Sequence, residues 1–130
     1  MNHEFYTIIE EICDKDPRYK QESYEFVMEA LSYAQKRLSR AKHVSGMELL
    51  EGIKELLLER FGPMTMPVLK CWGIQTTQDF GNIVFNLVQN KILNQNEEDS
   101  FEIFKNGYNF EEVFERGYRK RLARKISRMR

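Results

Sequence analysis

The sequence predicts a mainly α fold: a single compact helical domain, winged-helix-like, with a short β wing near residues 92–108. Three observations support this prediction. The chain has 130 residues, of which 42% are hydrophobic, and this suffices for one core without disulfides or a structural metal. It contains only 7 glycines and 3 prolines, so few residues interrupt long helices. Apolar residues also recur at intervals of three and four along most of the chain, which gathers them on one helical face.

The first two helices are predicted near residues 5–12 and 21–38. Four apolar side chains fall on one face of the first helix: Phe5, Ile8, Ile9 and Ile12. Asp16 and Pro17 end this helix, because proline cannot continue the backbone hydrogen bonds. The apolar stripe of the second helix consists of Tyr24, Val27, Met28, Leu31 and Leu38.

The third helix is predicted from Ser45 to Phe61. Ser45 and Glu48 have the spacing of a capping box, in which each side chain accepts from the other residue's backbone amide. The buried stripe of this helix comprises Leu49, Leu50, Ile53, Leu56, Leu57 and Phe61. Gly62 and Pro63 then close the helix.

Two further helices follow. A short one is predicted to start near Pro67, where proline is tolerated in the first turn, and to stop at Gly73. The next one covers residues 76–90 and has Asp79 in its first turn. Its inward side chains are Phe80, Ile83, Val84, Leu87 and Val88.

Glycines and aromatic residues within these helices have structural interpretations. Gly52 and Gly81 interrupt helical patterns at a cost of up to about 1 kcal/mol each, so we expect close approach of another helix there. Trp72, with Phe61 and Phe80, is expected in the core rather than in a ligand cage.

The final helix is predicted to begin at a second capping box, Asn109 with Glu112, and to reach Met129. Its apolar residues are Phe110, Val113, Phe114, Tyr118, Leu122 and Ile126. Periodicity does not decide whether the preceding residues 92–108 form two short strands of a wing or another helical turn.

The charge distribution divides the chain into two parts. Residues 1–115 hold all 20 acidic residues and 12 of the 20 basic ones, so this acidic helical domain has a net charge of −8. Residues 116–130 form a basic C-terminal helical arm with a net charge of +8. Its basic residues, the candidate nucleic-acid-binding residues, are Arg116, Arg119, Lys120, Arg121, Arg124, Lys125, Arg128 and Arg130.

Such a basic arm is typical of proteins that bind a polyanion, because each neutralised phosphate releases counterions. The alternative is that the arm folds back onto the acidic domain. Tyr118, Leu122, Ile126 and Met129 would give a helical arm a narrow apolar seam, which suits RNA, an anionic membrane surface or an acidic protein groove. Arginine outnumbers lysine six to two in the arm, and the planar guanidinium favours RNA phosphates and bases.

The sequence therefore predicts a small cytoplasmic binding protein whose arm anchors it to RNA or to a ribonucleoprotein such as the ribosome. The alternative is a protein–protein adaptor whose arm docks in an acidic groove of a partner. Sequence-specific DNA reading by helix 76–90 is disfavoured, because this helix lacks lysine and arginine and has Asp79 where phosphate would lie. Its side chains able to make neutral base contacts are Gln78, Asn82, Asn86 and Gln89.

No catalytic constellation, metal site or cofactor is predicted, and no segment is apolar enough to span a membrane. Cys13 and Cys71 are far apart in the sequence, so we expect both thiols to be reduced and buried in a cytosolic protein. His3 and His43 lack the spacing of zinc ligands. His43 could serve Cys71 as a base, but an amphipathic setting predicts an inert thiol.

Several segments together resemble the Minf-type family of small uncharacterised bacterial proteins. The segments are DKDPRY at 14–19, HVSGMELLEGI at 43–53, FGPM at 61–64, WGI at 72–74, DFGNIVFNLV at 79–88, and EDS at 98–100 with Phe104. The resemblance covers about residues 4–115 and implies a bacterial cytosolic protein. It implies no catalytic residue, since the family has no established activity, and the extension after Glu115 lies outside the shared pattern.

Overall fold

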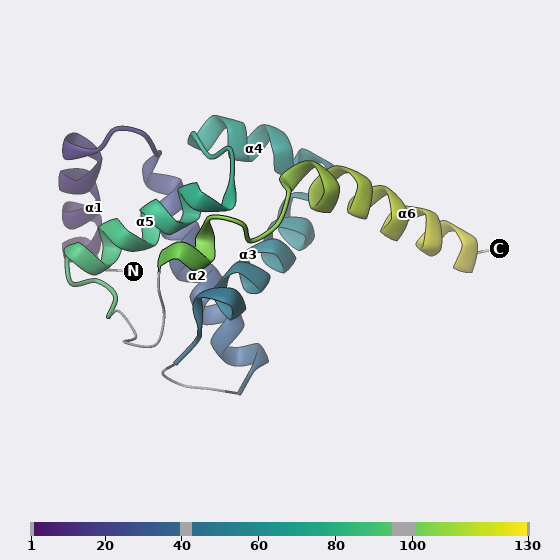
Figure 1. Cartoon of the computed structure of the whole chain (residues 1–130), viewed down its shortest axis with the longest axis horizontal. Helices are drawn as coiled ribbons and strands as arrows, with labels where there is room; N and C mark the ends of the chain where they lie inside the picture. The colour runs from purple at the N-terminus through teal and green to yellow at the C-terminus, as the bar shows by residue number, and fades with distance from the viewer. Residues whose placement is uncertain (1, 40–42, 95–100, 130) are drawn as a thin grey trace.

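The computed structural model describes residues 2–39, 43–94 and 101–129, and these residues are mainly helical (Figure 1). The α-helices are α1 (His3–Lys15), α2 (Gln21–Arg37), α3 (Gly46–Phe61), α4 (Thr65–Trp72), α5 (Thr77–Gln89) and α6 (Gly117–Arg128). Two 3₁₀ turns, η1 (Gly62–Met64) and η2 (Phe101–Phe104), and a π-helical segment, η3 (Glu111–Arg116), complete the elements. Helices α1 to α5 form a compact body, and α6 extends away from it to the C-terminus (Figure 1).

The predicted β wing near residues 92–108 is wrong for the described part of that segment. Residues 92 and 93 form a bend, residues 101–104 form η2, and no strand occurs among the described residues. Residues 95–100 lie outside them. This segment is helical rather than extended because of its packing against α5. The Phe104 ring is buried against Gly81, where an added Cβ would lie 2.7 Å from the Phe104 Cβ, so this segment packs onto α5 as a helical turn.

Most of the predicted helix ends are confirmed. The Ser45 capping box starts α3, with the Ser45 Oγ accepting from the Glu48 amide at 3.1 Å. Gly73 ends α4 in the left-handed conformation, with φ of 86°. The fourth helix begins two residues before Pro67, because the buried Thr65 hydroxyl bonds to the Leu57 and Gly62 carbonyls and turns the chain directly from η1 into α4.

The buried face of α2 differs from its predicted stripe. Leu38 is 37% exposed, whereas Phe26, Ala30 and Ala34 are buried. Ala30 and Ala34 are buried because they face Gly52 of α3, where an added Cβ would lie 3.0 Å from the Ala34 Cβ. The two helices therefore cross closely at small residues, and the predicted close approach at Gly52 is confirmed.

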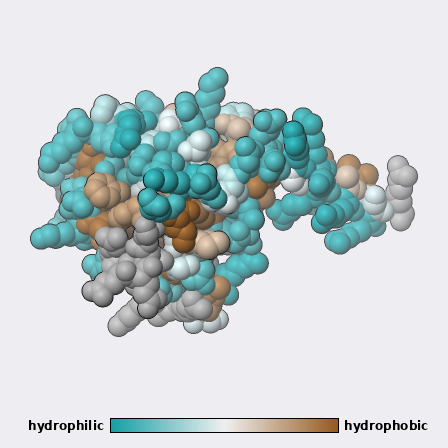
Figure 2. Space-filling view, viewed as in Figure 1, coloured by the Kyte–Doolittle hydropathy of each residue, from teal (hydrophilic) through white to brown (hydrophobic). Residues whose placement is uncertain are grey.

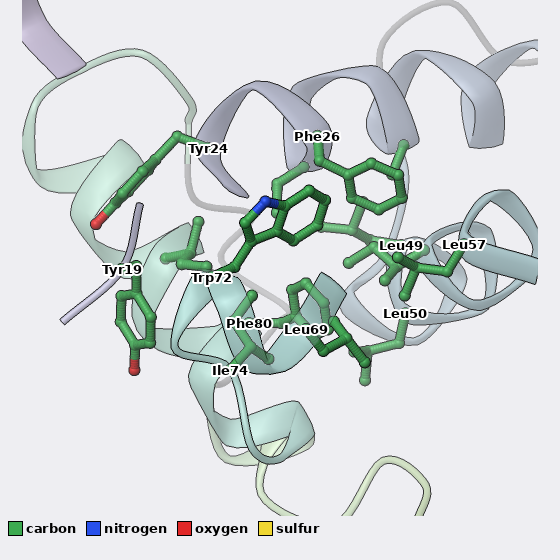
Figure 3. Packing of buried hydrophobic residues seen from close by; sticks show 14 of the residues in the cluster. Tyr19, Tyr24, Phe26, Leu49, Leu50, Leu57, Leu69, Trp72, Ile74 and Phe80 are labelled. Atoms are coloured by element: carbon green, nitrogen blue, oxygen red, sulfur yellow. The ribbon is translucent and has the colours of Figure 1, made fainter. Parts of the chain in front are cut away.

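The core lies between α2, α3, α4 and α5 (Figure 3). The Trp72 ring packs between Phe26, at 5.3 Å between ring centroids, and Phe61, at 5.8 Å. Phe80 of α5 is completely buried and contacts Phe110 edge-to-face. Trp72 and Phe80 are thus core residues as predicted, and Phe61 is half-buried at the core's edge.

The loop between α1 and α2 is held against α4 and α5. The Tyr19 hydroxyl donates to the Asp79 carboxylate and accepts from the Asn82 amide at 2.9 Å. Burial, reinforced by Asp79, raises the pKa of Tyr19 to about 12. Asn86 donates to the Asp16 carboxylate and to the Tyr24 hydroxyl, each at 3.0 Å. Asn82 and Asn86, two of the residues considered for base contacts, therefore have partners within the fold.

Replacing Asp16 with asparagine is expected to destabilise the protein at neutral pH and to have less effect in acid. The Arg18 guanidinium, at 2.7 and 2.8 Å, holds the pKa of the Asp16 carboxyl well below its usual range. Because the folded pKa is lowered, this stabilisation is complete above the unfolded pKa of about 4 and is lost as pH falls through the folded value. Arg18 is largely exposed, so we expect a loss of about 1 kcal/mol at pH 7.

Urea unfolding of the Asp16→Asn variant and the parent chain between neutral and acidic pH measures this effect. Asp14, an exposed carboxylate on α1, provides the control as Asp14→Asn, and we expect little change there. A loss of stability for Asp16→Asn that stayed constant down to about pH 2.5 would contradict the assigned ion pair.

Candidate nucleic-acid interface

Aromatic residues fix the base of the arm to the body. Phe110 and Phe114 are buried, with ring centroids 5.4 Å apart, and the Tyr108 hydroxyl donates to the Leu50 carbonyl at 2.7 Å. Asn109 accepts from the Glu112 amide at 2.9 Å, so this half of the predicted capping box forms. The predicted final helix begins with the π-helical η3, the kind of segment often found at functional sites.

Tyr118 is the last residue of the arm that is partly buried. Its ring lies over Gly62 at the end of α3, since an added Cβ on Gly62 would lie 3.5 Å from the ring. Every described residue after Tyr118 is exposed, and α6 has no buried residue. The arm therefore projects into solvent (Figure 1).

The basic side chains of the arm are accessible. All seven that the structure describes, between Arg116 and Arg128, are exposed. Among the described residues, no salt bridge includes any of them. The alternative in which the arm folds back onto the acidic domain is therefore wrong for residues 116–129. Arg130, the eighth predicted site residue, lies outside the described residues.

The described basic residues separate into two groups. A groove of about 520 Å³ lies along α6, lined by Tyr118, Leu122 and four basic residues of the arm and by Leu58 of α3. We call these four the groove cations: Arg121, Arg124, Lys125 and Arg128. The outer cations, which do not line the groove, are Arg116, Arg119 and Lys120. The spacing of the groove cations places them on one face of a helix, so this grouping can be predicted from the sequence. The sequence does not show that these cations share a groove with Leu58 of α3.

An apolar seam is also exposed on the arm. Leu122 is 42% exposed, Ile126 50% and Met129 79%. Figure 2 shows the arm as mainly hydrophilic, with apolar side chains near its free end. The arm is therefore an amphipathic helix whose apolar side has no cover within the described part of the chain.

The remaining sequence candidates give no comparable site. Cys13 and Cys71 are both free, but Cys71 is exposed and Cys13 is half-buried, so the expectation that both are buried is wrong. Burial, reinforced by Asp14, raises the pKa of the Cys13 thiol. The described residues contain no group of three metal-ligating side chains and no helix with the length and apolar character needed to cross a membrane.

The fold and this surface define a small helical domain that carries a projecting, basic and amphipathic C-terminal helix. Comparisons with protein-family models, with curated proteins and with solved structures gave no match. The resemblance to the Minf-type family therefore stays a prediction.

Proposed function

We propose that this chain is a small cytoplasmic RNA-binding protein that uses its C-terminal arm to attach to RNA or to a ribonucleoprotein such as the ribosome. The observation that carries the proposal is the exposure of seven basic side chains on α6 and its junction with η3, none of them in a salt bridge among the described residues. Phosphates can approach these cations without first displacing an internal carboxylate, so binding releases counterions at no cost in internal ion pairs.

The acidic body supports the same assignment. Its net charge of −8 repels a polyanion, so contact is directed to the arm, where the net charge is +8. Because α6 extends away from the body, a polyanion can reach its cations from solvent (Figure 1). The body is then free to present a second surface while the arm is bound.

Removal of residues 119–130 tests the proposal. This truncation retains Tyr118 and the buried aromatic anchor, so the body should fold, which circular dichroism can verify. We expect RNA affinity at low salt to fall at least tenfold and the dependence of log K on log salt to flatten, because seven basic residues are lost. Fluorescence anisotropy with labelled RNA from low to moderate salt measures both. Unchanged affinity would overturn the proposal.

A protein–protein adaptor is the second candidate, and the exposed apolar seam on α6 favours it. An amphipathic helix can place such a seam in the groove of an acidic partner. The variant Ile126→Gln with Met129→Gln removes apolar area without changing charge. Loss of a co-purifying protein, with RNA binding and its salt dependence intact, is the result expected of the adaptor. Pull-downs with and without nuclease show whether RNA links the two.

A further inference from the structure

Resting on the proposed function, we propose that the groove along α6, which Leu58 of α3 also lines, holds a single-stranded segment of RNA. The groove cations contact consecutive phosphates, and the Tyr118 ring stacks on a base. The outer cations contribute only to general electrostatic attraction.

The groove cations match the dimensions of a single strand. Arg128 lies seven positions after Arg121, which corresponds to about 10 Å along an α-helix. A stacked strand advances about 3.4 Å per nucleotide, so this face of the arm spans about three phosphates. The groove volume of about 520 Å³ is within the range of ligand pockets.

The composition of the groove favours unpaired bases. Besides its cations, it is lined by Tyr118, Leu122 and Leu58, so an aromatic ring and two aliphatic side chains lie beside the phosphate-binding groups. This combination of cations with an aromatic ring is the one that single-strand-binding proteins use, because a base can stack only when its face is free. The Tyr118 ring is partly buried beside Gly62, which restricts its motion before binding and so reduces the entropy lost on stacking.

The charge at the groove is also favourable on the body side. Leu58, which faces the groove from α3, is uncharged, and the groove lining includes no acidic residue. The outer cations lie on the part of the arm that contributes nothing to this lining. A strand in the groove therefore meets four cations and no carboxylate among the groove-lining residues, despite the acidic character of the body as a whole.

Two full-length variants of equal charge provide the main test. The groove variant carries Arg121→Gln, Arg124→Gln and Lys125→Gln. The outer variant carries Arg116→Gln, Arg119→Gln and Lys120→Gln. Anisotropy is measured with a labelled mixed-sequence RNA of about 16 nucleotides, at least the site size of typical single-strand binders, alone or annealed to its complement.

We expect the groove variant to bind the single strand at least tenfold more weakly than the outer variant. Its log–log salt slope should flatten by about 2, as expected for three lost contacts at about 0.7 each. The parent chain should bind the single strand more tightly than the annealed duplex. Equal losses for both variants, or duplex binding as tight as single-strand binding, would overturn the inference while the proposed function stood. No loss for either variant would overturn both.

Tyr118 provides an independent test through stacking. Tyr118→Leu should weaken single-strand binding at least fivefold with an unchanged salt slope, because a stacked base is lost and no charge is. Tyr118→Phe retains the ring and should bind like the parent. Thermal unfolding of both variants checks that the arm remains attached to Gly62. Equal affinities for the leucine and phenylalanine variants would contradict the role of the ring.

Discussion

Gly73→Ala is expected to lower the free energy of unfolding by about 3 kcal/mol or more. Gly73 has a φ of 86°, and the left-handed conformation costs a residue with a Cβ about 1–2 kcal/mol. The added Cβ would also lie well inside van der Waals distance of the Arg18 carbonyl oxygen. Since this neighbour is backbone, the clash is relieved only if α4 moves away from the loop before α2.

That movement would break a specific hydrogen bond. The Lys20 amide donates to the Trp72 carbonyl at 3.2 Å, directly beside Gly73, and its loss adds about 1 kcal/mol. Urea unfolding followed by circular dichroism measures the total. A second variant, Gly73→Asn, separates the two causes, because asparagine tolerates a positive φ but has the same Cβ. We expect it to be nearly as unstable as the alanine variant.

Gly117→Ala is the matched control. Gly117 has a φ of −62°, and an added Cβ would lie 3.4 Å from the Glu112 carbonyl oxygen, an ordinary contact. Alanine is a better helix former than glycine, so this variant should be unchanged or more stable by up to about 1 kcal/mol. A change of less than 1 kcal/mol for Gly73→Ala would show that the loop and α4 do not pack as described.

The sequence correctly predicts those features of the fold that depend only on residues close together in the chain. Ser45 with Glu48 marks the start of α3, and Gly73 marks the end of α4, because each signal lies within one turn of the helix end it predicts. The contact between Gly73 and Arg18 has no such signal. It depends on how the loop before α2 packs against α4, which no local pattern specifies.

Two predictions about the fold are wrong, the β wing near residues 92–108 and the buried stripe of α2, because each feature depends on contacts with distant residues. Phe104 becomes part of a 3₁₀ turn because Gly81 of α5 leaves space for its ring, and the local sequence of residues 92–108 does not contain that information. Ala30 and Ala34 are buried because Gly52 admits them, yet small residues add little to a hydrophobic pattern.

The arm has features of both kinds, some set by neighbouring residues and some by packing against distant segments. The charge of the arm and the spacing of its apolar residues are local properties, so the sequence predicts them. The side of α6 that shares a groove with Leu58 of α3 is not a local property, because a π-helical turn contains more residues than an α turn. The segment η3 therefore shifts the pattern of α6 relative to the anchored residues before it. Tyr118 still reaches Gly62, whereas Leu122 and Ile126 remain exposed.

Thr77→Val is expected to destabilise the protein by about 2–4 kcal/mol, although valine has nearly the same shape as threonine. The Thr77 hydroxyl is buried, donates to the Phe104 carbonyl at 2.6 Å and accepts from the Gly107 amide at 3.1 Å. Valine would leave both backbone groups without these partners, at about 1–3 kcal/mol for each one that stays buried. The hydroxyl therefore connects α5 to the segment that leads to the arm.

Two further variants separate the hydroxyl from the methyl group. Thr77→Ser retains both hydrogen bonds and loses one methyl, so its cost should be about 1 kcal/mol. Thr7→Val removes a surface hydroxyl that donates to the His3 carbonyl within α1, and its cost should be below about 0.5 kcal/mol. Hydrogen exchange should further show weaker protection of the described amides in residues 101–108 for Thr77→Val than for Thr77→Ser. If the serine variant were the less stable of the two, packing of the methyl group rather than hydrogen bonding would hold this segment on α5.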